Sequence, residues 1–531
     1  MAIYALGTLP LLNKLMDHQP NVDPVKQVAY ADDAVGTGNV HNLKIWWDAI
    51  LQHGPSFGYH INAQKSWIIV KESQQRIAEQ VFEGTGVNVT AEGQRHLGAI
   101  IGSEEYKQEF VAELVREWIN QIELLSKIAR VDPHSAYAAY AKGLQHKFTY
   151  TMRTIPRAGE FLSPIEDAIR HQLIPAITEK HNCNDIERQL LSLPVRLGGL
   201  GITNPSEDAD HEFENSNKLT TTLTNAIIDQ SSTTVKNDYE MRKAVSKENA
   251  IRQKNKQKLI EENLTTEKMK LHQLNQQKGA SSWLTTLPTT EHGFHLTKRE
   301  FWDSIRIRYG WPLSNMPSKC ACGKQYDVSH ALSCHLGGFT SIRHNELRNL
   351  TAGLLQQTCH DVRIEPPLEP LSGETFQYKT TKVSQEARLD VSARGLFVSY
   401  QKVFVDIRVV NPSAKRYEKQ SPEQILESNA SEKKREYCRR VLEIENGTFT
   451  PLIFTTNGGM ARECQAFYSR IAQLLAEKWK TPASTTVAWV RSRLSFALIR
   501  STHMSIRGSR KWMPAPIAAD EVVLSEVKQI Q

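Results

Sequence analysis

The sequence predicts a multidomain α+β protein. Three observations point to this class: a short strand–turn–strand pattern near Tyr30, apolar residues at helical spacing after Glu104, and strand-like runs that alternate with helices in 343–480. The chain has 531 residues. Because single cores rarely grow beyond about 250–300 residues, we expect roughly three or four domains.

Composition narrows the class of protein. A hydrophobic fraction of 40% is sufficient for buried cores, and the net charge of +7 suits a polyanionic partner. Seven cysteines in so long a chain do not suggest a disulfide scaffold. No window reaches the length of a membrane span, and the apolar start lacks a basic leader and a clear cleavage site. We therefore expect an intracellular protein that has no membrane partner.

The first chemical feature is the segment 27–34, in which small and apolar residues lead into Asp32 and Asp33, and Gly36 and Gly38 follow. This pattern predicts a hairpin with both aspartates at its tip. Adjacent carboxylates repel each other unless a cation lies between them, so the pair is a candidate Mg²⁺ site for in-line phosphoryl transfer. An ordinary Asp-Asp surface turn is the alternative.

Further motifs follow in order, and together they resemble the palm of a reverse transcriptase. They are a YxDD box at Tyr30 to Asp33, a Gly…Asn…Lys box at Gly58, Asn62 and Lys65, and a primer-grip-like turn at Leu97 and Gly98. The resemblance implies that Asp32 is a metal ligand, that Asp33 is its partner, and that Lys65 donates a proton to departing pyrophosphate.

Such palms carry a further aspartate on an earlier strand. In the segment 1–26 the acidic residues are Asp17 and Asp23, and neither lies in a buried-strand pattern. Pro24 follows Asp23 and favours a turn. We therefore expect a partial palm in 1–103, from a truncated element whose polymerase half is incomplete.

The next two regions are predicted to be helical. Apolar residues recur at spacings of three and four in 104–205, which resembles a thumb, and Leu193–Ile202 resembles the segment after the thumb in non-LTR retroelements. An all-α packing domain has the same pattern and remains the alternative. The segment 206–279 is rich in Lys, Glu, Gln and Asn, which predicts a charged helical linker.

A candidate zinc knuckle lies in 280–342. Cys320, Cys322, His330 and Cys334 are spaced C-x-C-x7-H-x3-C, and Gly323 permits the tight turn. Three thiolates and one imidazole form a tetrahedral Zn²⁺ set. His335 in place of His330, or buried cysteines beside a chance histidine, are the alternatives.

The second chemical centre is predicted in 343–480, where the order α-β-β-β-α-β suggests a mixed sheet with flanking helices. The strand 402–410 is apolar except at its charged positions, among them Asp406. An ionised carboxylate there is costly unless a metal or a cation pairs with it. Asp390 lies on the preceding strand, so the two carboxylates can meet. A salt-bridged structural aspartate is the alternative.

This region resembles the PD-(D/E)xK nuclease core. Together with the zinc motif and Arg343-His344, it resembles the restriction-like endonuclease of site-specific non-LTR retrotransposons. The resemblance implies that Asp390 and Asp406 are Mg²⁺ ligands and that Glu365 is the acidic residue of the first strand. It also implies a lysine-to-tyrosine motif on the next helix, formed by Lys433 or Lys434 with Tyr437. Arg408 stands where a lysine is usual, and Leu389 replaces the leading proline. Because arginine is a poor proton shuttle, activation of water falls to Lys433 or Lys434.

The segment 481–531 is predicted to be a basic tail. No Asp or Glu occurs from Lys478 to Ala519, and arginines are interleaved with tryptophans. This composition favours phosphate contacts with base stacking, and a membrane-surface helix is the weaker alternative.

The resemblances together imply a fragment of a retroelement protein for target-primed reverse transcription. In that reaction a nuclease nicks DNA and a polymerase extends the 3′ end on an RNA template. The implied cofactors are Mg²⁺ and Zn²⁺, the partners are an RNA template and a DNA target and primer, and the expected location is the nucleus. A catalytically dead or domesticated zinc-containing nucleic-acid-binding protein, and a zinc-dependent DNA-binding regulator, are the competing hypotheses.

Overall fold

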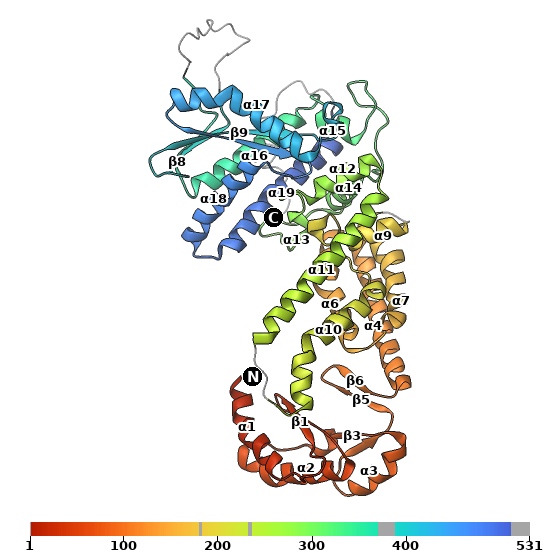
Figure 1. The fold of residues 1–531 in the computed structure, drawn as a ribbon. Coiled ribbons are helices and arrows are strands. Elements are labelled where there is room, and N and C mark those ends of the chain that lie inside the picture. Colours follow the sequence, from red (N-terminus) through yellow and green to blue (C-terminus); the bar gives the residue numbers. More distant parts are fainter. Residues whose placement is uncertain (1, 180–182, 232–235, 370–387, 511–531) are drawn as a thin grey trace. The chain divides into compact units, whose positions relative to one another are not determined.

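The computed structural model describes residues 2–179, 183–231, 236–369 and 388–510 (Figure 1). Helices and strands both occur and helices predominate, so the expected α+β class is confirmed. The chain forms two compact units, each from several segments. Unit 1 comprises the described residues of Met1–Leu124, Gly143–Gln172 and Thr203–Asn255, and unit 2 those of Leu125–Lys142, Leu173–Ile202 and Lys256–Gln531.

Unit 1 begins with a helix and a hairpin. Helix α1 (Ala2–Asp17) precedes β1 (Lys26–Tyr30) and β2 (Asp33–Thr37), which pair antiparallel around a two-residue turn. The buried amide of Gln27 donates to Leu12 O (2.7 Å) and accepts from the indole N–H of Trp46 (2.9 Å). Trp46 lies on α2 (Val40–His53), so one side chain links the hairpin to both helices.

The remaining strands of unit 1 are short. Strand β3 (Trp67–Ile69) pairs parallel with β4 (Asn88–Thr90) across α3 (Gln75–Val81), and β5 (Gly93–His96) pairs antiparallel with β6 (Ala99–Gly102). The pattern of residues 66–70 predicts a strand, and β3 confirms it. The β5–β6 turn consists of two residues with positive φ, 48° at Leu97 and 82° at Gly98. Such values match the right-handed twist of a tight hairpin.

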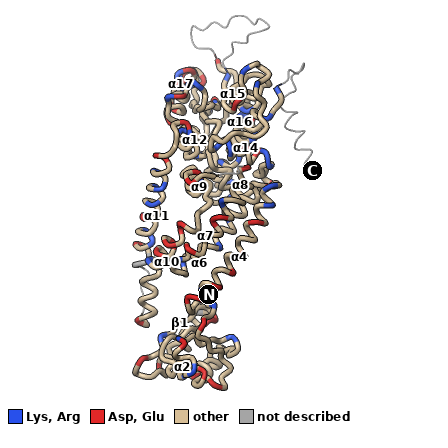
Figure 2. Tube along the Cα trace, turned by 90° about the vertical axis from the view of Figure 1, so that its right-hand side faces the viewer, with Lys and Arg blue, Asp and Glu red and all other residues tan. Residues whose placement is uncertain are grey.

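The middle of the chain is helical, as its periodicity predicts. The helices are α4 (Glu104–Ala129), α5 (Pro133–Ala139), α6 (Gln145–Thr154), α7 (Gly159–Ala168), α8 (Ile174–Thr178), α9 (Asp185–Ser192), α10 (Pro205–Ile228) and α11 (Lys236–Glu262). Two π-helical turns interrupt this series at 140–144 and 169–173. Acidic and basic residues are mixed along α11 (Figure 2), which fits the expected solvated helix.

Unit 2 contains a four-stranded mixed sheet in the order β10-β9-β8-β7. The strands are β7 (His360–Ile364), β8 (Val391–Arg394), β9 (Lys402–Val410) and β10 (Thr448–Thr455). Strands β9 and β10 run parallel, whereas β7, β8 and β9 pair antiparallel. Helices α16 (Phe339–Gln356), α17 (Pro422–Glu443) and α18 (Arg462–Trp479) contact this sheet (Figure 1). The predicted α-β-β-β-α-β order is confirmed.

Two boundaries differ from those that the sequence pattern predicts, which are a strand over 387–391 and a helix over 431–445. The strand β8 begins only at Val391, while Arg388 forms an isolated bridge with Pro367 and residue 387 lies outside the described chain. The helix is α17, which begins earlier than predicted, at Pro422. Its start is fixed by a capping box, in which Ser421 accepts a hydrogen bond from the N–H of Gln424 (3.2 Å).

The segment predicted as a basic tail contains a helix of the core. Helix α19 (Ala483–Arg507) packs against α16 and α18, and Val490, Leu494 and Leu498 are buried there. The apolar face for which a membrane surface was the alternative is therefore covered by protein. The described part of the chain includes no helix that is long and apolar enough to cross a membrane. Residues 511–531 lie outside the described chain.

Four shorter helices complete unit 2: α12 (Thr266–Gln276), α13 (Ser282–Thr285), α14 (Lys298–Tyr309) and α15 (Val328–Ser333). Asp303 on α14 is fully buried and accepts two hydrogen bonds of 2.7 Å from the guanidinium of Arg507. Burial opposes ionisation of Asp303, but the hydrogen bonds from Arg507 and His503 outweigh it and lower the pKa of this carboxyl. This ion pair fixes α19 to α14.

His134 on α5 makes unit 2 sensitive to acid. Its ring is 1% exposed, and Nδ1 accepts a hydrogen bond from the N–H of Leu296 (3.1 Å), which requires a neutral imidazole. Burial, with a smaller contribution from His295, lowers the pKa of His134 from 6.5 to about 4. The folded chain therefore resists protonation at a pH where the unfolded chain binds a proton.

We expect the free energy of unfolding to fall as the pH drops from 6.5 to about 4, since only the unfolded state takes up the His134 proton there. This loss amounts to about 3 kcal/mol for a shift of this size. His134→Asn keeps an acceptor for Leu296 but does not titrate. Chemical denaturation across this pH range should give a shallower slope for the variant than for wild type. The exposed His292→Asn is the control, and parallel curves for wild type and His134→Asn would contradict the assignment.

Candidate functional site

The four predicted zinc ligands come together in unit 2. The ligand atoms of Cys320, Cys322, His330 and Cys334 all lie within 4.8 Å of one another. The two buried thiols, of Cys320 and Cys334, are 3.9 Å apart, and Cys322 Sγ lies 3.3 Å from His330 Nε2. Within the described ranges, no other group of three or more potential ligand residues comes this close together. The cluster includes His330 and not His335. Three thiolates and an imidazole at this spacing could bind one zinc ion.

The turn that carries the first two cysteines is set by backbone hydrogen bonds. Gly323 has φ 85° and its N–H donates to Cys320 O (2.8 Å), while the Cys320 N–H donates to Lys324 O (2.9 Å). The Lys324 N–H lowers the pKa of the Cys322 thiol by donating to its sulfur. Asp327 caps α15 by accepting from the N–H of His330 (2.7 Å). The ligands are thus positioned by local structure.

Two buried arginines lie against α15, in structural roles that the sequence analysis did not predict. Arg343 donates to Leu332 O (3.0 Å), and Arg510 donates to Ala331 O (3.0 Å) and to the hydroxyl of Tyr326 (2.8 Å). Burial lowers the pKa of Arg343 to about 10. Both guanidinium groups connect α15 to the neighbouring helices, so the zinc module is integrated into unit 2.

The second candidate site lies where β8 and β9 meet. Val391, the first residue of β8, pairs with Val405, and the N–H of Asp390 just before it donates to Val405 O (3.0 Å). The carboxylate of Asp390 accepts a hydrogen bond from the N–H of Ile407, the residue that follows Asp406. Asp390 therefore lies beside Asp406, close enough for its charge to act on that carboxyl.

One cation lies at these carboxylates. Lys433 Nζ on α17 is 3.1 Å from Asp406 Oδ2. Burial raises the pKa of Asp406 to about 6; the positive charge of Lys433 opposes this shift and the negative charge of Asp390 adds to it. The ring of Tyr437 lies below the same ammonium, with Nζ 5.1 Å from the ring centroid, and burial raises the pKa of the tyrosine. Lys433 is therefore the lysine of the expected pair that reaches the site.

The other predicted residues of this region have partners of their own. Lys434 forms an ion pair with Glu463, and Glu365 forms one with Arg348. Arg408 donates to the carboxylate of Glu432 (2.8 Å). In the described residues, no set of three carboxylates lies within ligand distance of one another. The site therefore consists of Asp390, Asp406, Lys433 and Tyr437. Glu365, Arg408 and Lys434 form ion pairs with other residues.

His344 completes the site, and the sequence assigned it no role beyond its place in the Arg-His motif. Its Nε2 lies 3.1 Å from Asp390 Oδ2. Burial opposes protonation of this ring, but the hydrogen bond to Asp390 outweighs it and raises the pKa of His344. His344 lies on α16, five residues after Phe339, where the helix begins (344 − 339). The helix thereby fixes the orientation of the Asp390 carboxylate.

The aspartate hairpin of unit 1 has the expected form. Ala31 and Asp32 form the turn between β1 and β2, with φ 54° at Ala31, and the side chains of Asp32 and Asp33 are exposed. Tyr59 donates its hydroxyl to Asp32 O (2.9 Å). Within the described chain neither carboxylate has an ion-pair partner, and Lys65 is likewise exposed without one. The sheet that carries them consists of β1 and β2 in the described residues.

No protein-family model matches the sequence, and no curated protein matches it either.

We expect one Zn²⁺ per chain at the four-residue cluster. Cys322→Ser should lose the metal because three ligands hold zinc much more weakly than four, and zinc removal should lower the melting temperature, since binding energy in such a site is also folding energy. Elemental analysis and thermal unfolding measure both effects. His335→Ala should retain zinc and serves as the matched control. A full zinc content in Cys322→Ser would show that the ion binds elsewhere.

Proposed function

We propose that unit 2 is a metal-dependent DNA endonuclease stabilised by a structural zinc ion. The observation that carries this proposal is the position of Asp390 beside Asp406, where its carboxylate accepts from the N–H of Ile407, with Lys433 Nζ 3.1 Å from the second carboxylate. Two carboxylates and one lysine at the central strands of a mixed sheet are groups that phosphodiester cleavage can use to bind a cation and to orient water.

The donor set fits Mg²⁺. Burial raises the pKa of Asp406, and the negative charge of Asp390 adds to this rise, so a cation bound at the two carboxylates would favour their ionised forms. Mg²⁺ commonly binds proteins through one or two carboxylates, with water and phosphate oxygens completing its octahedron. When bound at Asp390 and Asp406, it would neutralise charge on the scissile phosphate. Lys433 is placed to orient or deprotonate the attacking water, and His344 holds Asp390 in position.

The wider proposal is a retroelement protein for target-primed reverse transcription in the nucleus, with an RNA template and a DNA target as partners. It is supported by the hairpin of unit 1, which presents Asp32 and Asp33 at an exposed tip as a YxDD box requires. Mg²⁺ bound at this pair would serve nucleotide addition. Lys65 has the role of proton donor in this proposal.

The second candidate function is a zinc-containing nucleic-acid-binding protein without catalysis. One observation favours it. Glu365, the third acid of the predicted nuclease set, forms an ion pair with Arg348, and among the described residues it does not form a metal-ligand cluster with Asp390 and Asp406. Arg408 is likewise paired with Glu432, so it cannot act as the missing lysine.

Nicking of supercoiled duplex DNA decides between the two candidates. We expect the zinc-loaded chain to nick DNA with Mg²⁺, and Asp406→Ala to lose at least about 100-fold in rate because one metal ligand is removed. Asp32→Ala should nick normally and is the control from unit 1. Binding without any cutting, in Mg²⁺ or in Mn²⁺, would favour the non-catalytic function.

A lysine substitution at the unusual arginine gives a sharper test. If Arg408 serves only to bind Glu432 and Asn429, Arg408→Lys should leave the nicking rate within about two-fold of wild type, since a lysine keeps the ion pair. Lys433→Met should by contrast abolish nicking, because it removes the ammonium at Asp406 and keeps the length of the side chain. Normal nicking by Lys433→Met would show that another group activates water.

The chain by itself is expected to extend a primer on an RNA template only negligibly, because the described sheet of unit 1 presents two carboxylates where two metal ions need a third acid. A primer-extension assay with Mg²⁺ measures this, with Asp32→Ala as the matched control. Robust extension by the wild-type chain that disappears in Asp32→Ala would overturn the expectation.

A further inference from the structure

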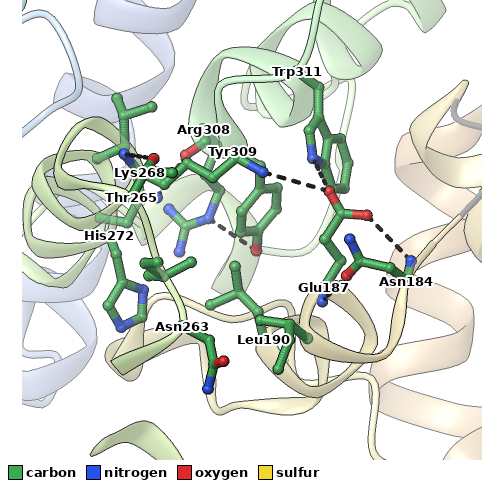
Figure 3. Close-up of a pocket in the computed structure, with 14 residues that line it drawn as sticks. Asn184, Glu187, Leu190, Asn263, Thr265, Lys268, His272, Arg308, Tyr309 and Trp311 are labelled. Carbon is green, nitrogen blue, oxygen red and sulfur yellow. Dashed lines mark hydrogen bonds and ion pairs between the residues drawn. The ribbon is translucent and has the colours of Figure 1, made fainter. Parts of the chain in front are cut away.

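We propose that a cavity in unit 2, separate from the nuclease site, binds one base of a single-stranded nucleic acid. The cavity lies among α9, α12 and α14 and has a volume of about 160 Å³ (Figure 3). A cavity of about 150 Å³ is sufficient for benzene. The space therefore suits one aromatic ring of the size of a pyrimidine, and it is too small for an extended ligand.

The cavity contains a buried histidine without hydrogen bonds. His272 is 2% exposed, and among the residues that the structure describes neither Nδ1 nor Nε2 has a hydrogen-bond partner. The nearest acid is Glu261, whose Oε1 lies 3.6 Å from Nε2, beyond hydrogen-bond distance. Burial lowers the pKa of His272, so the ring is a neutral donor and acceptor. Unsatisfied buried polar groups are costly, and a ligand that pairs with this ring removes the cost.

The backbone makes room for this ring. Gly198 has φ 88°, and a Cβ atom at this position would lie 2.8 Å from His272 Nδ1. A larger residue would both strain the turn and displace the imidazole. The turn that carries Gly198 is held to α14 by the hydroxyl of Tyr309, which donates to Gly198 O (3.1 Å).

Two aromatic rings form a fixed wall of the cavity. Tyr309 and Trp311 have ring centroids 5.0 Å apart, and the indole N–H of Trp311 donates to Glu187 Oε1 (3.0 Å). Glu187 is in turn held by the N–H of Asn184 at the start of α9 (3.3 Å). Rings that are immobilised in this way lose little entropy on binding, and stacking of bases on aromatic side chains is the common mode of single-strand recognition.

The polar groups distinguish a base from a purely apolar ligand. Lys268, which lines the cavity, has Nζ 3.9 Å from Glu187 Oε1 (Figure 3), and its side chain is 43% exposed, so the ammonium is accessible to solvent. A phosphate outside the cavity would find its counter-charge there. Inside, the imidazole of His272 and the carboxylate of Glu187 offer a donor and acceptors to the edge of a base. An apolar side chain of a protein partner would offer no hydrogen bond to the imidazole of His272.

The test measures binding, so its outcome does not depend on nuclease activity. Fluorescence anisotropy of the zinc-loaded full chain compares labelled oligouridine with an abasic strand of the same length. We expect His272→Leu to weaken oligouridine binding about ten-fold, the scale of one lost base contact, and to leave abasic binding unchanged. The exposed His292→Leu should affect neither strand. His272→Leu should also melt at or above the wild-type temperature, because it replaces an unpaired buried polar group.

Three competitors identify the source of the base: oligouridine, oligothymidine and free uridine monophosphate. Competition by any of them that is lost in His272→Leu supports the site and names its ligand. Equal effects of His272→Leu on oligouridine and abasic binding, or none on either, would overturn the proposal. If the variant fails to fold, photocrosslinking of thiouridine-containing RNA to wild type decides. Crosslinks to Tyr309 or Trp311 support the site, and crosslinks confined to other segments refute it.

Discussion

The buried ion pair between Asp303 and Arg507 is the contact on which the arrangement of unit 2 depends. Asp303 has no exposed surface, and its charge is tolerated because Arg507 donates two hydrogen bonds to it and His503 lies beside it. Loss of one partner of such a pair costs about 3–5 kcal/mol, because the other charge stays buried. The pair fixes the end of α19, and α19 contacts α15, α16 and α18. The zinc module and the carboxylate sheet are therefore held by the same helix.

Buried polar groups in unit 2 differ in how completely they are paired, and this difference separates structural groups from candidate functional ones. Asp303 is fully paired and serves packing. Burial raises the pKa of Asp406 to about 6, and Lys433 offsets this shift only in part. The imidazole nitrogens of His272 have no hydrogen-bond partner among the described residues. Because incomplete pairing costs free energy in the ligand-free chain, it is most readily explained at positions where a ligand completes the set.

Site residues could be predicted from the sequence where they lie close together in the chain. They could not be predicted where tertiary packing determines which side chains meet. Four metal ligands within fifteen residues can be recognised by spacing, because one turn and one short helix bring them together. A charged residue in an apolar strand identified Asp406. The choice between Lys433 and Lys434 depends on the rotation of α17, which tertiary contacts set, since neighbouring helical residues point in different directions. The partner of Glu365 and the cavity around His272 involve segments far apart in the chain, and no local pattern predicts them.

Lys433 has two roles in the proposed nuclease, as the ion-pair partner of Asp406 and as the group that acts on water, and it cannot fill both at once. In the ligand-free chain its ammonium neutralises Asp406, which is the charge that Mg²⁺ would neutralise there. Mg²⁺ bound as we propose would compete with the lysine for this carboxylate. Glu436 Oε2, 3.5 Å from Nζ, and the face of Tyr437, 5.1 Å away, would remain as partners of the ammonium. Lys433 would then be released from Asp406 to act on water only when the metal is present, which would couple cleavage to metal loading.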